Sequence, residues 1–236
     1  MDKRRRAILI AAIILAAGLA VASAIWDGHY LLLSAVAMTL AMAPLFVRFE
    51  RRRLEPREIA MLAALAAVAA LGRIAFAPLP SFKPTSFVVI VAALVFGSEA
   101  GFIVGAVAAL ASNLFLGQGP WTPWQMFAWG MVGATAGWLR HTRFMKSRIG
   151  LCAFGLVWGF LFGWIMNVWS LLSLPDAFGW KLVLITYAQS FYFDLAHAAA
   201  NVLFLGFFGL SWVRLLDRIR KKYGLLENRD AGRRPL

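Results

Sequence analysis

Three polar side chains in the stretch Thr186–Asn201 have the types and spacing to form one site. Asp194, His197 and Asn201 are three and four positions apart, which places them on one face near the outer start of the final apolar helix. Ionisable residues at membrane depth indicate a functional site by default. The alternative is a structural cluster in which Asp194 caps the helix and orients His197. A metal site is less favoured, because no second histidine or acidic partner lies at ligand spacing.

A second polar group surrounds the connection Gly117–Pro123, within "SNLFLGQGPWTPWQMFAWG". Its chemically useful members are Gln118, Trp121, Trp124 and Gln125. Glycines and prolines predict a rigid turn, and an interfacial aromatic belt accounts for the tryptophans. It does not account for the two amides, so we predict the mouth of a pocket above Asn113. A second proline-rich outer loop, Ala77–Ser86, adds Lys83 to this group.

Two asparagines end stripes of small residues. The first stripe is Gly97, Gly101, Gly105, Ala109 and then Asn113; the second is Gly155, Gly159, Gly163 and then Asn167. A spacing of four keeps each stripe on one helix face and permits close helix packing. At about 1.5 Å per residue, both amides lie about 20 Å along their helices, in the outer third of a bilayer. This shared depth favours a site over the alternative, a simple hydrogen bond across a helix interface.

The elements that carry these residues are membrane helices. The chain is 61% hydrophobic and 15% charged, with a mean hydropathy of +0.73, so a soluble globular domain is excluded. A bilayer core needs about 20 apolar residues of helix, and the runs lack the alternation of a membrane barrel. The eight predicted segments are Ala7–Ile25, Tyr30–Val47, Ile59–Phe76, a short one at Thr85–Phe96, Ala100–Leu116, Trp124–Leu139, Ile149–Leu172 and Phe191–Leu216.

Charge predicts the topology. The 24 Lys and Arg residues exceed the 11 Asp and Glu residues, and in an eight-span walk nearly all basic clusters fall on one side. These clusters lie at 3–6, 48–57, 140–148 and 214–234. The positive-inside rule therefore places both termini in the cytoplasm. The basic residues are interpreted as topology signals rather than as a nucleic-acid surface.

The basic stretch Arg48–Arg57 is the one clear internal boundary. It separates an N-terminal two-helix extension (1–50) from a six-helix core (57–222) and a basic tail (223–236). The first segment also resembles a signal peptide ending at Ala22–Ala24, but its apolar run is longer than the usual one, which favours an uncleaved helix. Cys152 is the only cysteine and lies within a span, so neither a disulfide nor a thiolate metal site is expected.

The segment Glu58–Phe76 carries overlapping pairs of small residues. They are Ala60, Ala63, Ala64, Ala67 and Ala70. Such a smooth face permits close contact with another helix, either within the chain or on a partner protein. Residue spacing does not choose between the two.

The chain resembles the substrate-capture (S) components of energy-coupling factor (ECF) vitamin transporters. The resemblance covers about Arg57–Lys222 through "REIAMLAALAAVAALGR", "PSFKPTSFVVIVAALVFGSEAGFIVGAVAALASNLFLGQGPWTPWQMFAWGMVG" and "FDLAHAAANVLF". It implies a six-helix, non-enzymatic protein in a prokaryotic plasma membrane that binds a vitamin on the outer side. It also implies a transmembrane coupling subunit, which docks on the alanine face, and two cytoplasmic ATPases on other chains.

The resemblance also makes the outer polar residues candidates for the vitamin pocket. They are Lys83, Asn113, Gln118, Trp121, Trp124, Gln125, Asn167, Asp194, His197 and Asn201. Stacking surfaces with amides and charges suit a heteroaromatic ligand. The "GQGPWTPWQ" block favours cobalamin or a precursor, with riboflavin, thiamine-pathway and queuosine-type ligands as alternatives. Met1-Asp2-Lys3 lacks the histidine of the nickel and cobalt branch, which argues against free metal as cargo, and no cofactor is expected.

Two other classes of function compete with this interpretation. An intramembrane enzyme acting on a lipid would use the polar residues near His197, but the sequence has no hydrolase, zinc-protease or diphosphate motif, and no P-loop. A stand-alone secondary carrier would usually show inverted repeats or a continuous polar path, whereas polarity here is concentrated toward one side.

Overall fold

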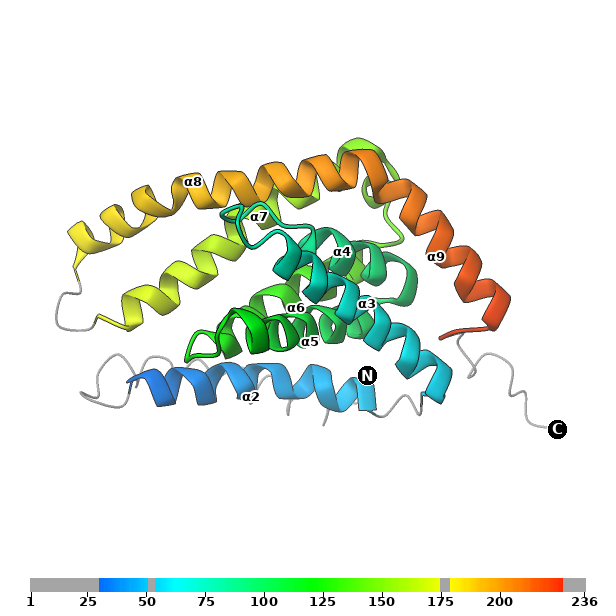
Figure 1. Ribbon diagram of the computed structural model, residues 1–236, viewed down its shortest axis with the longest axis horizontal. Helices are drawn as coiled ribbons and strands as arrows, with labels where there is room; N and C mark the ends of the chain where they lie inside the picture. Colours follow the sequence, from blue (N-terminus) through cyan, green and yellow to red (C-terminus); the bar gives the residue numbers. More distant parts are fainter. Residues whose placement is uncertain (1–29, 51–53, 175–178, 227–236) are drawn as a thin grey trace.

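The structure is a computed structural model that describes residues 30–50, 54–174 and 179–226. Its helices are α2 (Tyr30–Glu50), α3 (Pro56–Ala75), α4 (Thr85–Phe96), α5 (Ser98–Leu116), α6 (Thr122–Leu139), η1 (Phe144–Lys146), α7 (Arg148–Leu172), α8 (Trp180–Phe204), the π-helical turn η3 (Leu205–Gly209) and α9 (Leu210–Tyr223). The described residues contain no strand, so the predicted all-helical class is confirmed (Figure 1).

Four helical stretches of the described chain are long and apolar enough to cross a membrane. They are Pro56–Ala75, Ser98–Leu116, Arg148–Leu172 and Trp180–Tyr223. A multi-pass membrane protein is therefore supported, while the count of eight spans and the orientation of the termini stay predictions. The first predicted segment, Ala7–Ile25, lies outside the described residues.

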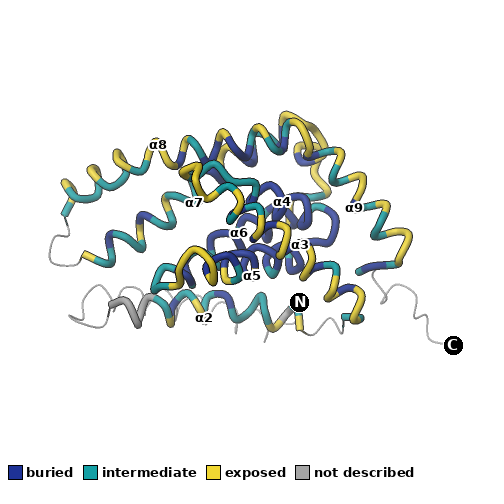
Figure 2. Tube along the Cα trace, in the orientation of Figure 1, coloured by how far each residue is buried: buried dark blue, intermediate teal, exposed yellow. Residues whose placement is uncertain are grey.

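Helix α4 forms the centre of the core. Its predicted bounds, Thr85–Phe96, are confirmed, and eleven of its twelve residues are buried. Twelve residues rise only about 18 Å, less than the thickness of a bilayer core. Helices α3, α5 and α6 pack around it, so α4 is covered by protein rather than by lipid (Figure 2).

Glycines set the two closest helix crossings. A Cβ atom on Gly101 of α5 would collide with Ala93 and with the backbone of Gly133, and one on Gly159 of α7 would collide with the backbone of Ala198. Both belong to the predicted stripes of small residues, so the close packing predicted for these stripes is confirmed. The first stripe faces α4 and α6, and the second faces α8.

The last apolar segment differs from its prediction. We expected one helix over Phe191–Leu216, but α8 begins at Trp180, and the π-helical turn leads into α9, which runs in a different direction (Figure 1). Asp194 therefore lies about 21 Å along α8 and not at its start. The expectation that Asp194 caps the helix is wrong, because the helix extends nearly four turns before it.

The alanine face of α3 is largely open. Ala60, Ala63, Ala64 and Ala67 are exposed, whereas Ala70 is buried and does not belong to the open face. The reason is the rotation of α3, which turns Ala70 with its neighbour Ala69 into the core. Helix α2 packs on α5 and α6 instead, through the buried cluster of Met42 and Phe102, and leaves this face uncovered.

Candidate functional site

Arg73 organises a polar cluster at the end of α3. Its Nη1 donates to Ser112 Oγ at 2.6 Å and to Asn113 Oδ1, and its Nη2 donates to Gln125 Oε1 at 3.3 Å. The guanidinium also lies 4.8 Å from the ring centroid of Trp129. Only 7% of the residue is exposed, and no acidic side chain of the described chain pairs with it. A buried cation is thus held by neutral acceptors and an aromatic face.

Asn113 connects this cluster to the turn between α5 and α6. Its Nδ2 donates to Thr122 Oγ1 at 3.0 Å and to Gln125 Oε1 at 2.8 Å. Thr122 Oγ1 donates in turn to Gln118 Oε1 at 2.8 Å, and Gln118 Nε2 donates to the Leu110 carbonyl. The predicted amides at 113, 118 and 125 therefore lie in one network, in which Gln118 fastens the turn.

His197 is linked to the same region through Ser86. The Ser86 hydroxyl lies 2.7 Å from His197 Nε2 and accepts a hydrogen bond from Trp129 Nε1 at 3.1 Å. Phe162 of α7 packs on both rings, with centroids 4.4 Å from Trp129 and 5.0 Å from His197. These contacts join α8 to the Arg73 cluster through α4 and α6.

Asn167 belongs to a second polar cluster, between α7 and α8. Its Nδ2 donates to Ser190 Oγ at 2.7 Å, and Ser190 Oγ donates to Asp194 Oδ2 at 3.0 Å. Gly163 leaves room for the Asp194 carboxyl, because a Cβ atom there would overlap it. The second asparagine thus has polar partners, but in a cluster of its own.

The predicted site of Asp194, His197 and Asn201 is divided by the fold. Asp194 faces Ser190, His197 faces Ser86, and Asn201 Nδ2 donates to the Gly155 carbonyl at 2.9 Å. The three residues share a broad face of α8, but that face meets α7 along one side and α4 along the other. They therefore do not act as one triad, and the described residues contain no group that could hold a metal ion.

Tryptophans of α6 and α7 adjoin members of the two polar clusters in the sequence. Trp121 and Trp169 form an edge-to-face pair with centroids 5.8 Å apart, and Trp124 is buried. The Nε1 atoms of Trp124 and Trp169, like Nε of Arg73, are buried and have no acceptor among the described residues. Buried donors without acceptors are rare in native proteins.

Lys83 in the loop between α3 and α4 adds a second cation. It is partly buried, it has no acidic partner among the described residues, and its charge acts on both Arg73 and His197. Burial and the positive charge of Arg73 lower the pKa of Lys83 below its ordinary value. The structure thus places Lys83 close enough to the Arg73 cluster for the two charges to interact.

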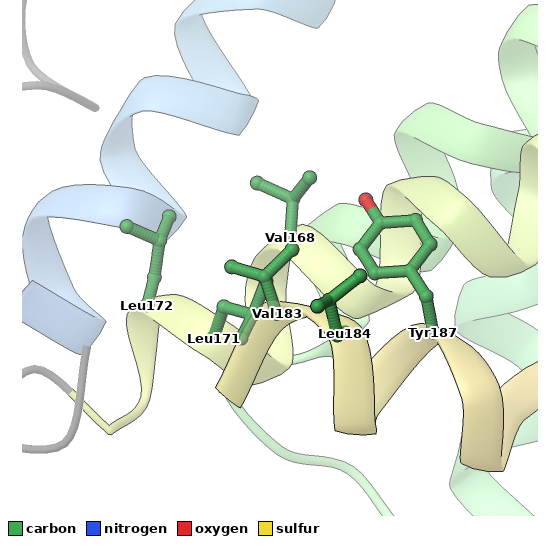
Figure 3. Close-up of a pocket in the computed structure, with 6 residues that line it drawn as sticks. All are labelled: Val168, Leu171, Leu172, Val183, Leu184 and Tyr187. Carbon is green, nitrogen blue, oxygen red and sulfur yellow. The ribbon is translucent and has the colours of Figure 1, made fainter. Parts of the chain in front are cut away.

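An apolar cavity of about 460 Å³ opens between the C-terminal end of α7 and the N-terminal part of α8 (Figure 3). It is lined by Val168, Leu171, Leu172, Val183, Leu184 and Tyr187. Its volume suits a small ligand, but neither polar cluster lines it. We therefore rest the candidate site on the polar clusters and regard the cavity as an adjoining apolar surface.

Several residues of this site were missed in the sequence, and Arg73 and Ser86 are the most central of them. Arg73 was not singled out from the sequence, and Ser86 was interpreted only as the end of the loop Ala77–Ser86. One signal for Arg73 was available, since it is the only charged residue of the predicted apolar segment Ile59–Phe76. No local signal marked Ser86, because its importance depends on the approach of α6 and α8.

Comparison with known proteins gives one match. The model of the family described as ECF-type riboflavin transporter, S component, matches residues 53–209, about two-thirds of the chain. No curated protein and no solved structure matches the chain.

Proposed function

Because the chain belongs to the family of ECF-type riboflavin transporter S components, we propose that it captures riboflavin at the outer ends of its helices. S components are substrate-binding subunits of transporters and are not enzymes. The cobalamin ligand favoured from the sequence is not confirmed, since the matching family is of the riboflavin type. Riboflavin was among the alternatives and takes its place.

The observation that carries this proposal is the buried, acid-free Arg73 cluster beside tryptophan rings. Riboflavin has a flat heteroaromatic ring system with carbonyl and ring-nitrogen acceptors along one edge. We propose that the unpaired buried donors Arg73 Nε and Trp169 Nε1 donate hydrogen bonds to such acceptors, and that the tryptophan faces offer stacking surfaces. Every buried donor that gains an acceptor on binding adds both affinity and specificity.

We assign the ligand-contacting role to the Arg73 cluster and to the residues that face it. They are Arg73, Lys83, Asn113, Trp121, Trp124, Gln125 and His197, with Asn167 and Asp194 on the α7–α8 side. Gln118 holds the turn in place, because both its amide atoms are engaged within the turn. We assign Asn201 to helix packing, because it bonds the backbone of α7.

We propose that the exposed alanines of α3 contact the coupling subunit. ECF S components act with such a subunit and with ATPases. Ala60, Ala63, Ala64 and Ala67 form a smooth, uncovered stripe that a partner helix could approach closely. Ala70 is left out of this surface because it is buried.

The first test is direct identification of the ligand. The protein would be purified in mild detergent, denatured, and the released small molecules identified by mass spectrometry, because tightly bound ligands dissociate slowly. Ligand-free protein would then be titrated with riboflavin and followed by quenching of flavin fluorescence, with cobalamin as the matched competitor. Stoichiometric riboflavin binding that cobalamin does not displace is expected. Binding of cobalamin without binding of riboflavin would refute the ligand assignment.

A further inference from the structure

A second cavity lies at the opposite end of the helices from the Arg73 cluster. It has a volume of about 290 Å³ and is formed where the ends of α4 and α6, the η1 turn and the start of α9 meet. The basic residues of the predicted cytoplasmic face are concentrated here. It shares no residue with the candidate riboflavin site.

Three cations border this cavity, and its floor is apolar. Arg140, Lys146 and Arg214 come from three different elements, whereas Leu94 and Met145 supply apolar surface between them. Lys146 and Arg214 are exposed and have no acidic partner among the described residues.

The one described acid nearby on α9 is already engaged. Asp217 pairs with Arg220 and with Lys221, each at 2.8 Å, and so does not neutralise Arg214. Lys146 and Arg214 therefore keep their positive charges without an acidic partner in the described part of the chain.

The course and composition of α9 are typical of a helix at a membrane surface. The π-helical turn at Leu205–Gly209 redirects the chain, and α9 then lies across the end of α4 (Figure 1). Leu216 of α9 is buried against the core, whereas Arg214 and Arg218 face outward. An amphipathic helix with basic residues on its polar side is typical of the interface between bilayer and water.

We propose that this cavity binds an anionic phospholipid. The headgroup phosphate lies between Arg140, Lys146 and Arg214, and the first part of an acyl chain contacts Leu94 and Val213. Basic pockets between membrane helices bind anionic headgroups in this way. The apolar floor favours a lipid over a free phosphate ion, because a small hydrated anion gains nothing from apolar contact.

Native mass spectrometry of the full chain in detergent tests the proposal. The probes are phosphatidylglycerol and phosphatidylcholine with identical acyl chains. The variant Lys146→Gln/Arg214→Gln removes two cations from the cavity, and the matched control Arg218→Gln/Lys222→Gln removes two from α9 outside it. Each basic residue near an anionic lipid contributes about 1 kcal/mol, so the cavity variant should bind phosphatidylglycerol roughly thirtyfold more weakly.

Support requires that the control variant keeps the affinity of the original protein within about threefold and that phosphatidylcholine binds weakly to all three proteins. Equal losses in both double variants would overturn the proposal, because they would indicate only the general charge of this face. Equal binding of the two lipids would overturn it as well. If millimolar inorganic phosphate competed with phosphatidylglycerol, the cavity would be assigned to a free anion and the lipid proposal would be overturned. Circular dichroism and thermal unfolding check that the variants are folded. The measured quantity is lipid binding, so the outcome does not depend on riboflavin binding.

Discussion

Replacement of Asn113 by alanine tests the candidate site most sharply. Asn113 is 1% exposed and makes three side-chain hydrogen bonds, of which one is accepted from the Arg73 guanidinium. Without its amide, Arg73 keeps Ser112 and the longer bond to Gln125 and is no longer fixed in one orientation. Binding would then have to order the arginine side chain again.

The cost of that ordering sets the expected effect. Fixing a long side chain such as arginine costs about 1.5–2 kcal/mol of conformational entropy. The affinity for riboflavin should therefore fall roughly 12- to 30-fold. The variant should also lose about 1–3 kcal/mol of stability, because the Arg73 guanidinium, Thr122 Oγ1 and Gln125 Oε1 each lose a hydrogen-bond partner.

Flavin fluorescence titration of the purified protein measures this effect. The matched control is Asn201→Ala, which removes the same buried amide but breaks a single bond to the Gly155 carbonyl, away from the Arg73 cluster. It should lose stability and keep the riboflavin affinity within twofold. An unchanged affinity in Asn113→Ala, or an equal loss in both variants, would refute the assignment of the site to the Arg73 cluster.

Three further predictions concern the partner surface, the helix packing and the loop cation. Ala63→Leu/Ala67→Leu should reduce riboflavin uptake at least tenfold in cells that express the coupling subunit and ATPases, with binding unchanged, because bulky side chains block close helix contact. Gly159→Ala should cost about 1–3 kcal/mol of stability, measured by thermal unfolding, because its Cβ overlaps the Ala198 backbone. Lys83→Met should raise the melting temperature at neutral pH and flatten the rise of the melting temperature with pH. In the original protein the pKa of Lys83 is lowered, so on raising the pH the folded state loses the proton before the unfolded state does. The stability of the original protein therefore grows as the pH approaches the ordinary pKa of 10.5, and the variant lacks this growth.

Each of these predictions has its own control and contrary outcome. Ala199→Leu places the same bulk on an exposed position of α8, and equal loss of uptake there would argue against a specific α3 surface. Gly206→Ala meets only Cys152 Sγ at 3.4 Å and should be tolerated, so an equal loss of stability would show that helical glycines in general, not this crossing, set the cost. A melting temperature of Lys83→Met that keeps the full pH dependence would show that other groups are responsible.

Hydropathy and helical spacing determined the elements. The bounds of α4 and the ends of α5, α6 and α7 were predicted closely, because apolar runs and the glycines and prolines between them are local signals. The stripes of small residues likewise predicted two close crossings, because a spacing of four fixes a face wherever the helix lies.

The tertiary structure decided which of those faces meet. Asp194, His197 and Asn201 have the spacing of one site, yet they bond to α8 itself, to α4 and to α7. Arg73 became the centre of the outer polar cluster only because α5 and α6 bring neutral acceptors to it. Sequence specifies which side chains share a helix face, whereas the rotation and crossing of the neighbouring helices decide what that face contacts.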